Sequence, residues 1–531
     1  MKSAGILFVL VLAGFAASTI TEQHLRDAQS DPATWLTYGK NYQGWRYSNL
    51  AEINASTVSR LAPKWIAQTG TDGSETTPLV FGGRMFITGP SNHASALDAL
   101  TGHRLWDYHS APPAGLSMCC GEVNRGFAAL GDKLFKVNIE AKLVALDART
   151  GSVLWETAIE DHKKGFTSTL APLVIKNKVL VGIAGAEFGT RGFVDAYDAN
   201  TGERLWRSYT VPGPGEPGSE TWSGDAWERG GGSTWITGTY DSELNLTYWG
   251  TGNPGPGLDG EGRPGDNLYT CSLIALDADT GKRKWHYQFT PHDTHDWDAV
   301  ADPVLIDMVV NGRKVKAVVQ ADRNGFFYAL DRTNGKLLHA KPYTKVNWAK
   351  GIGVDGKPIV VPGLDPSEEG TKVCPGLGGG HNWSATAYSQ QAQLYYFAST
   401  DVCEIFYRNK VEYRRGQWYQ ASTNAGIPSE PATGAVVAVD PATGETRWRF
   451  EMVTPTSSGM LATAGGLVFT GDGQGYLVAL DARTGKPVWH FQTGGRISAP
   501  PITYTLNGKQ QIAIAAGSSI ITFALVGDGQ R

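Results

Sequence analysis

The stretch "ALDARTGSVLW", Ala145–Trp155, is one copy of a motif that recurs along the whole chain. The motif has the form Ala-x-Asp-x-x-x-Gly-x-x-x-Trp, and a seventh copy, Ala329–His339, ends in histidine instead of tryptophan. The five other copies are Ala96–Trp106, Ala196–Trp206, Ala275–Trp285, Ala438–Trp448 and Ala479–Trp489. Chance does not produce so many matched copies, so the chain is built from a repeated structural unit.

Each copy of the motif predicts two strands joined by a tight turn. Runs such as "KLVALD", Lys142–Asp147, alternate as a strand does. In the Asp-x-x-Thr-Gly segment the aspartate can bind nearby backbone N–H groups, and the glycine can adopt a positive φ. The next strand carries the tryptophan, which we expect to pack between neighbouring units.

The spacing of the motif predicts an all-β, eight-bladed propeller with tryptophan docking motifs. Most motif aspartates are about 40–55 residues apart, the period of a four-stranded blade. The step from Asp331 to Asp440 is about twice as long. We expect it to contain one degenerate blade around "SATAYSQQAQLYYFAST", residues 384–400. We also expect strands at residues 62–70 and 510–525 to pair within one blade and close the ring.

The N-terminus resembles a secretory signal peptide, which we place at residues 1–20. Lys2 is followed by an apolar run, Ile6–Phe15, that is too short to span a bilayer comfortably, and then by small residues. An uncleaved anchor is the alternative. We expect residues 21–531 to form the propeller domain in an oxidising compartment, where disulfides persist. The net charge of −4 gives no basic excess for binding nucleic acid.

Two of the five cysteines, Cys119 and Cys120, are adjacent. Adjacent Cα atoms lie about 3.8 Å apart, closer than the about 4.4–6.8 Å usual for a disulfide. From the pair alone we favour two buried thiols, and export raises the odds of a bond.

Several stretches interrupt the repeat and carry polar residues near strand ends. They are residues 73–80, 119–126, 166–172, 182–192, 230–235, 250–257, 290–300 and 321–330. In a propeller such residues line the central funnel. A propeller scaffold that binds protein partners without catalysis is the rival hypothesis, and convergence of these residues on the axis would distinguish the two.

These stretches resemble the pyrroloquinoline quinone (PQQ)-dependent alcohol dehydrogenases, the quinoprotein methanol and ethanol dehydrogenases. The resemblance covers nearly the whole mature chain, and adjacent cysteines followed by Val-Asn-Arg are its most specific mark. It implies PQQ held between a Cys119–Cys120 disulfide and Trp235. The other matching quinone-binding positions are Glu75, Arg125, Thr169, Ala184, Gly185, Ala186 and Arg323.

The resemblance also implies a metal ion beside the quinone, with Glu187, Asn253 and Asp296 as oxygen ligands. Asp298 lies two residues beyond Asp296, and in an extended loop both carboxylates could face one ion. Lanthanide-dependent members carry aspartate there, so we favour a lanthanide(III) ion, with Ca²⁺ as runner-up. Asp298 as the cap of a turn is the plain alternative. We treat His292 and His295 as supporting or surface residues.

The resemblance implies oxidation of a primary alcohol to the aldehyde, with Asp296 as general base and Arg323 bound to the reacting carbonyl oxygen. The sequence contains no Cys-x-x-Cys-His haem site. The expected electron acceptor is therefore a separate cytochrome c in the periplasm. The resemblance pairs Cys374 with Cys403 and leaves Cys271 as a buried thiol. The preferred alcohol and the oligomeric state, including a homodimer, are not determined by the sequence.

Overall fold

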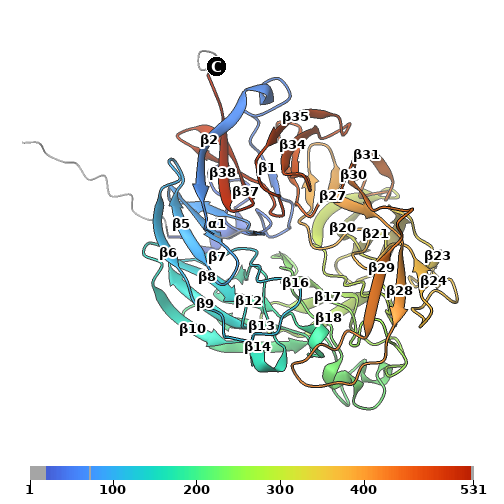
Figure 1. Cartoon of the computed structure of the whole chain (residues 1–531). Coiled ribbons are helices and arrows are strands. Elements are labelled where there is room, and N and C mark those ends of the chain that lie inside the picture. Colours follow the sequence, from blue (N-terminus) through green and yellow to red (C-terminus); the bar gives the residue numbers. More distant parts are fainter. Residues whose placement is uncertain (1–18, 71–72, 528–531) are drawn as a thin grey trace, which may run out of the picture.

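The computed structural model describes residues 19–70 and 73–527, and the predicted signal peptide falls almost entirely outside them. Within the described residues the chain forms eight antiparallel sheets with four strands each, one of them extended by a fifth, parallel strand. The sheets follow one another around a ring, each with one edge toward the centre (Figure 1). The predicted all-β propeller is therefore confirmed.

Four sheets lie in the first part of the ring, and their strands are consecutive in sequence. The first consists of β3 (Leu79–Phe81), β4 (Arg84–Thr88), β5 (Ala94–Asp98) and β6 (Arg104–Tyr108). The second consists of β7 (Ala128–Leu130), β8 (Lys133–Asn138), β9 (Lys142–Asp147) and β10 (Val153–Ala158). The third consists of β11 (Leu173–Ile175), β12 (Lys178–Gly182), β13 (Phe193–Asp198) and β14 (Arg204–Tyr209). The fourth consists of β15 (Thr239–Asp241), β16 (Leu246–Gly250), β17 (Ser272–Asp277) and β18 (Arg283–Gln288).

The fifth sheet also has consecutive strands, whereas the last three sheets include strands that are not consecutive in sequence. The fifth consists of β19 (Val304–Val310), β20 (Arg313–Ala321), β21 (Phe326–Asp331) and β22 (Leu337–Pro342). The sixth consists of β26 (Ala387–Ser389), β27 (Leu394–Asp401), β30 (Thr433–Val439) and β31 (Thr446–Met452). The seventh consists of β1 (Tyr47–Ser48), β32 (Leu461–Thr463), β33 (Leu467–Gly471), β34 (Tyr476–Asp481) and β35 (Pro487–Gln492). The eighth consists of β2 (Leu61–Gln68), β36 (Ile502–Leu506), β37 (Lys509–Ala516) and β38 (Ser519–Leu525).

The eighth sheet joins the two ends of the chain. β2 pairs antiparallel with β38, from Leu61 opposite Leu525 to Gln68 opposite Ser519. This pairing confirms the predicted closure of the ring.

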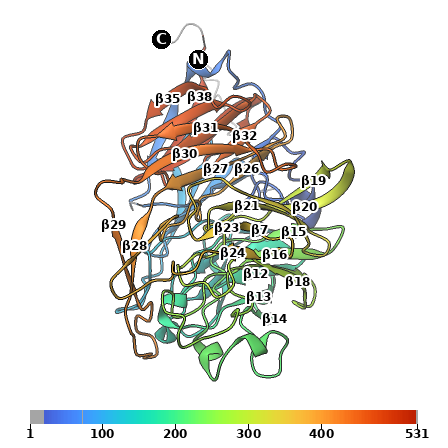
Figure 2. The ribbon, with the colours of Figure 1, turned by 90° about the vertical axis from the view of Figure 1, so that its right-hand side faces the viewer.

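The predicted degenerate blade between Asp331 and Asp440 is wrong. Residues 384–400 supply β26 and β27, which pair with the motif strands β30 and β31 in one sheet. The long step arises from insertions, namely β23 (Ala349–Ile352), β24 (Pro358–Val360), β25 (Thr371–Val373), β28 (Glu404–Arg408) and β29 (Ser422–Gly426). Figure 2 shows β28 and β29 on one flat side of the ring, with the β19–β20 hairpin extending on the other. The additional sheet is instead the one that closes the ring, and it carries no copy of the motif.

The motif residues pack as the turn chemistry predicts. In the copy at residues 145–155, Asp147 Oδ1 accepts hydrogen bonds from the N–H groups of Arg149 and Thr150 at 2.9 and 2.8 Å. Gly151 has a φ of 75°, and a Cβ there would lie 2.6 Å from the Trp106 ring of the preceding copy. Trp106 Nε1 also donates to Ala148 O at 3.2 Å. Contacts of the same kind join Trp155, Trp206, Trp285 and Trp448 to the turn glycine of the next copy. Trp489 belongs to the last copy, which is followed by a sheet without the motif.

The copy that ends in histidine makes the same kind of contact. His339 Nε2 lies 3.1 Å from Pro441 O, and its ring lies against Gly444 of the following copy. The histidine therefore takes the place of the tryptophan.

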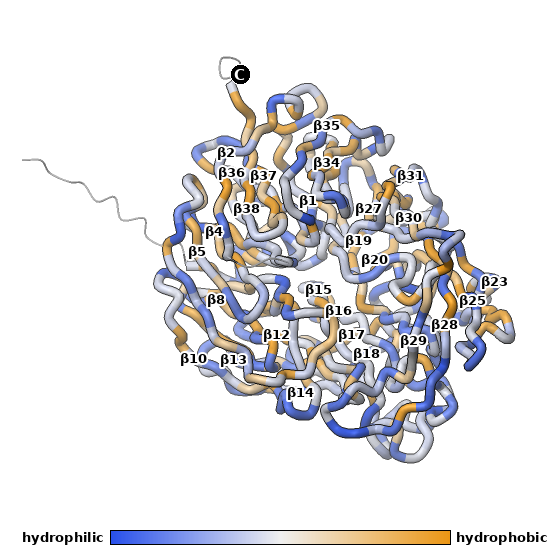
Figure 3. The backbone as a smooth tube through the Cα atoms, in the orientation of Figure 1, coloured by the Kyte–Doolittle hydropathy of each residue, from blue (hydrophilic) through white to orange (hydrophobic). Residues whose placement is uncertain are grey.

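The helices of the described residues are short. They are α1 (Glu22–Arg26) and the 3₁₀ turns η1 (Val58–Arg60), η2 (His162–Lys164), η3 (Ala186–Phe188), η4 (Ser219–Thr221) and η5 (Ala226–Arg229). Among these helices none has the length and apolar character needed to cross a membrane. Figure 3 shows apolar stretches along the strands, where the sheets pack face to face, and hydrophilic stretches mainly in the loops.

Candidate active site

The polar stretches that interrupt the repeat meet at one end of the ring's axis. Arg125 precedes β7, Thr169 precedes β11, Trp235 precedes β15 and Asp298 precedes β19, and these four strands are the first strands of their sheets. Neighbouring inner segments run in the same direction, as the parallel bridge between Thr77 and Gly126 shows. Parallel segments of this kind bring the residues before each inner strand to the same end of the axis.

Arg125 lies at the centre of a buried polar group. Its Nη2 lies 2.8 Å from Glu75 Oε2, and its Nη1 donates to Thr169 Oγ1 at 2.7 Å. The guanidinium also lies 5.1 Å from the ring centroids of both Trp235 and Trp383. Burial raises the pKa of Glu75, while the charge of Arg125 opposes the rise. Arg125 therefore contacts two other predicted quinone-binding residues, Glu75 and Thr169, directly.

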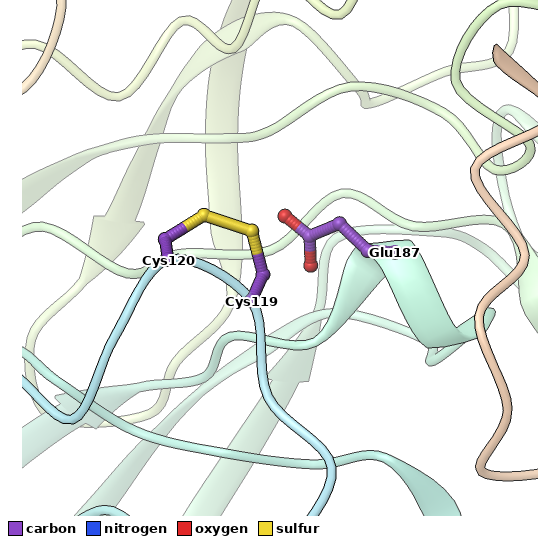
Figure 4. A group of neighbouring side chains, drawn as sticks. All are labelled: Cys119, Cys120 and Glu187. Atoms are coloured by element: carbon purple, nitrogen blue, oxygen red, sulfur yellow. A yellow bond between two sulfur atoms is a disulfide. The ribbon is translucent and has the colours of Figure 1, made fainter. Parts of the chain in front are cut away.

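Cys119 and Cys120 form a disulfide, as the family resemblance predicts, and not the two buried thiols that the pair alone favours. The disulfide lies on the loop before β7, and the Glu187 carboxylate points toward it from η3 (Figure 4). The ligand atoms of these three residues lie within 4.8 Å of one another. Cys374 and Cys403 form the second disulfide, and Cys271 is a free, buried thiol, as predicted.

The segment of predicted quinone-binding backbone, Ala184–Ala186, leads into η3. Ala184 pairs with Thr167 in an antiparallel bridge, and Gly185 has a φ of 115°. A Cβ at Gly185 would lie 2.1 Å from Gly165 O, so only glycine fits there. The turn that it allows places Glu187 beside the disulfide.

Asp298 connects several predicted site residues. Its Oδ2 accepts hydrogen bonds from Trp235 Nε1 at 2.9 Å and from Arg323 Nη1 at 3.0 Å. Its Oδ1 accepts from the backbone N–H of Asn253 at 2.6 Å. Asp298 is 5% exposed, so it is not the solvent-facing cap of a turn.

Asp296 and Asp298 both face Arg323, although not because the segment is extended. Asp296 has a φ of 61°, in the left-handed region that aspartate tolerates better than most residues. Its Oδ2 lies 3.7 Å from Arg323 Nη2. The turn, rather than strand alternation, brings the second carboxylate to the same guanidinium.

Acidic groups outnumber basic groups in this part of the site. Burial raises the pKa of Glu187 to about 7, and the charge of Asp298 adds to the rise. Burial raises the pKa of Asp296 well above its usual range; the charge of Arg323 opposes the rise, and Asp298 and Glu187 add to it. Three carboxyl groups, those of Glu187, Asp296 and Asp298, therefore lie near the Arg323 guanidinium.

The carboxylates do not form one closed ligand group. Within the described residues, Cys119, Cys120 and Glu187 make up the group of potential ligand atoms that lie within 4.8 Å of one another. The Asp298 oxygens point to Trp235, Arg323 and Asn253 instead.

The residues fit both an anionic quinone and a hard cation. Arg125 Nε and Arg323 Nε are buried without a hydrogen-bond partner, so two guanidinium donors are available for carboxylate or carbonyl oxygens. Glu187, Asn253, Asp296 and Asp298 supply carboxylate and amide oxygens, the donors that hard cations prefer. A cation would also offset the repulsion among the three carboxyl groups.

Trp383 was not identified from the sequence, although its ring centroid lies as close to the Arg125 guanidinium as that of Trp235, at 5.1 Å. Its signal is its position in "GGHNWSATAY", a stretch that lies before an inner strand and departs from the motif.

His295 stacks on Trp297 at 4.3 Å, and its Nε2 lies 2.9 Å from Leu364 O. His292 Nδ1 lies 2.8 Å from Gly265 O, so both histidines have structural partners.

Comparison with known proteins gives consistent matches. Residues 35–349 match the family model described as "Glucose/ethanol/alcohol dehydrogenase, beta-propeller domain", and residues 432–531 match a model named for the outer membrane protein assembly factor BamB. The chain is 37% identical to the quinoprotein alcohol dehydrogenase PedH of Pseudomonas putida, over 96% of this chain and 91% of PedH. It is 36% identical to the lanthanide-dependent methanol dehydrogenase of Methylacidiphilum fumariolicum, over 97% of this chain and 90% of that protein.

Solved structures agree with the sequence matches. A europium-containing methanol dehydrogenase superimposes with a TM-score of 0.90 and 34% identity, covering 95% of this chain and 100% of that one. The quinohemoprotein alcohol dehydrogenase of Comamonas testosteroni superimposes with a TM-score of 0.91 and 35% identity, covering 96% of this chain and 83% of that one.

Proposed function

Because the chain belongs to the PQQ-dependent alcohol dehydrogenases, we propose that it oxidises a primary alcohol to the aldehyde, with a lanthanide ion as Lewis acid and Asp296 as general base. The observation that carries the proposal is the shared contact of Trp235 and Arg323 with Asp298. This contact joins the proposed quinone face, the proposed catalytic arginine and the proposed metal ligand in one buried group.

Arg125 and Glu75 would hold the quinone at one end, with Thr169 and the Ala184–Ala186 backbone around it. The Cys119–Cys120 disulfide and Trp235 would cover its two faces. When bound, the quinone accepts two electrons and the metal ion supplies Lewis acidity. The unpartnered Nε atoms of Arg125 and Arg323 support this assignment, since each guanidinium keeps a buried donor for an oxygen atom.

Asp296 would remove the hydroxyl proton of the alcohol. Its side chain is 16% exposed and lies 3.7 Å from Arg323, whose charge favours the ionised form that a base requires. Arg323 would also donate to the oxygen on which negative charge develops.

Glu187, Asn253, Asp296 and Asp298 are the proposed metal ligands. Three carboxylates favour a trivalent ion over a divalent one on charge grounds, and the similarity to a lanthanide-dependent enzyme and to a europium-containing structure supports this choice. The alternative is Ca²⁺ at the same ligands.

We further propose that residues 21–531 form one eight-bladed domain in which each of the eight sheets is a blade. Contacts such as Trp106 with Gly151 would act as docking motifs between blades. We place the mature protein in the periplasm after removal of residues 1–20, with a separate cytochrome c as electron acceptor and a homodimer as one candidate assembly.

The decisive experiment loads the quinone-free protein with PQQ and either Ca²⁺ or La³⁺, then measures dye reduction across a series of primary alcohols. Turnover with La³⁺ and not with Ca²⁺ supports the proposal, and the alcohol series identifies the substrate. Turnover with Ca²⁺ alone would establish the alternative metal.

A further inference from the structure

A small cavity lies on the axis of the ring, next to the inner strands that lead away from the candidate site. Its wall includes Ala128, Pro172, Thr237 and Asp302. Each of these residues follows a site residue by two to four positions, namely Arg125, Thr169, Trp235 and Asp298. Strands rise about 3.3 Å per residue, so the cavity begins about 10 Å along the axis from the site. β15 and β19, which start beside it, lie near the centre of the ring in Figure 3.

The N-terminal segment covers the other side of this cavity. Leu25 and residues 36–39, 41–42 and 44 line it there. The space open to water is about 20 Å³, and one water molecule needs about 10–15 Å³. The cavity therefore has room for water.

Three polar atoms at the cavity wall lack protein partners. Asp302 Oδ1, Thr37 Oγ1 and Tyr42 Oη are each buried without a hydrogen bond. Asp302 is 6% exposed, and its other oxygen accepts from the backbone N–H of Thr386 at 3.2 Å. Buried polar atoms of this kind are normally satisfied by ordered water.

Asp302 is electrostatically connected to the candidate site. The cations that act on its carboxyl group are Arg46 and Arg125, and Arg125 is the guanidinium that contacts Glu75. Tyr38 lines the cavity, and burial raises the pKa of its hydroxyl; the charges of Asp302 and Glu75 add to the rise, while those of Arg46 and Arg125 oppose it.

Arg46 is a buried cation whose hydrogen bonds go mainly to backbone carbonyls, including Met460 O at 3.1 Å and Pro501 O at 3.0 Å. The positive charge of Arg46 therefore favours the ionised form of Asp302. Burial raises the pKa of Asp302 to about 7 while the two arginines oppose the rise, so this carboxyl group can both accept and release a proton near neutral pH.

Oxidation of a primary alcohol to an aldehyde breaks one C–H and one O–H bond, forms the C=O double bond, and releases two electrons and two protons. Under the proposed function, on which this inference rests, the electrons leave to an external one-electron acceptor. The protons must then reach solvent. We propose that Asp302 and the water of the axial cavity form a proton-release route from the Arg125–Glu75 pair to the side covered by the N-terminal segment.

The test compares the wild-type enzyme with Asp302→Asn, which keeps an acceptor for the Thr386 N–H. The PQQ- and metal-loaded enzymes are reduced anaerobically with alcohol, then mixed with a one-electron acceptor in H₂O and in D₂O. We expect Asp302→Asn to slow reoxidation at least about tenfold and to raise the solvent isotope effect, with unchanged PQQ affinity and unchanged reduction by alcohol. Asp302→Glu should restore most of the rate.

The matched control is Asp307→Asn, five residues further along the same segment, at a carboxylate that is 66% exposed. It should reoxidise as the wild-type enzyme does. If Asp302→Asn does not fold, Ala129→Val, which fills the cavity, should give the same slower rate and larger isotope effect. A wild-type rate and isotope effect in a folded Asp302→Asn or Ala129→Val enzyme would overturn the proposal.

A second measurement does not depend on the proposed activity. In infrared difference spectra of the quinone-free protein, Glu187 and Asp302 should both contribute protonated-carboxyl bands that titrate near neutral pH. The Asp302 band should shift in D₂O, persist in Glu187→Gln and be missing in Asp302→Asn. Lack of the Asp302 band in the wild-type protein would overturn the route. Failure of the loaded wild-type enzyme to oxidise any alcohol would instead overturn the proposed function, and the infrared result would then decide on Asp302 separately.

Discussion

Trp235 Nε1 donates a hydrogen bond to Asp298 Oδ2 at 2.9 Å. The ring proposed to cover one face of the quinone is thereby oriented by the carboxylate proposed to bind the metal. The same oxygen accepts from Arg323 at 3.0 Å, so one side chain positions both a binding surface and a catalytic group. A change at Asp298 should therefore affect metal selectivity and quinone binding together.

Asp298→Ala should abolish activity with La³⁺ and weaken La³⁺ binding by at least about tenfold, since it removes a charged ligand and leaves Arg323 less well paired. The affinity for Ca²⁺ should fall less, because a divalent ion depends less on the third carboxylate. Isothermal titration with both ions in the same variant provides the internal control. Equal losses for the two ions would contradict the role of Asp298 in selectivity.

Asp296→Ala should abolish turnover while PQQ remains bound. A general base contributes about 10²–10⁴-fold to the rate. The other carboxylate that contacts Arg323, that of Asp298, already accepts hydrogen bonds from Trp235 and Asn253. Steady-state dye reduction gives the rate, and the quinone absorbance gives the occupancy. Retained activity with bound PQQ would remove Asp296 from the mechanism.

Arg125→Lys should weaken PQQ binding by about 1.5–3 kcal/mol, the range for a hydrogen bond to a charged group. Lysine keeps the charge but cannot contact Glu75 and Thr169 at once while retaining a donor for the quinone. Quenching of tryptophan fluorescence by PQQ measures the affinity, because Trp235 and Trp383 flank this guanidinium. Wild-type affinity would show that Arg125 has only a structural role.

The repeat predicted most of the fold because its information is local. The strand alternation, the Asp147 turn and the positive φ of Gly151 all lie within one copy of the motif. The supposed blade at residues 384–400 was wrong because spacing alone does not distinguish an extra unit from insertions such as β28 and β29. Neither Trp383 nor Asp302 belongs to a motif, and only the convergence of inner strands reveals their positions.

Gly151→Ala should destabilise the protein more than Gly131→Ala. Both glycines have a positive φ, 75° and 66°, so each substitution carries a backbone cost of about 1–2 kcal/mol. Only at Gly151 would the new Cβ also meet the Trp106 ring, at 2.6 Å, which adds about 1–3 kcal/mol of overpacking. Thermal melts of the two variants test the difference. Equal melting temperatures would show that the tryptophan–glycine contact can relax without cost.

The stability of the metal-free, quinone-free protein should fall as the pH rises toward neutrality, and Glu187 should account for part of this fall. Burial raises the pKa of the folded-state carboxyl group to about 7, whereas an unfolded glutamate has a pKa of about 4.3. Between these values the folded protein holds a proton that the unfolded chain has lost, so stability decreases as pH rises and levels off above about 7. Glu187→Gln has no such proton. Its melting temperature relative to wild type should therefore rise from pH about 5 to about 7.5, and added La³⁺ and PQQ should stabilise the wild type more than the variant. A relative melting temperature that stays constant across this range would show that Glu187 is ionised in the folded protein at all of these pH values.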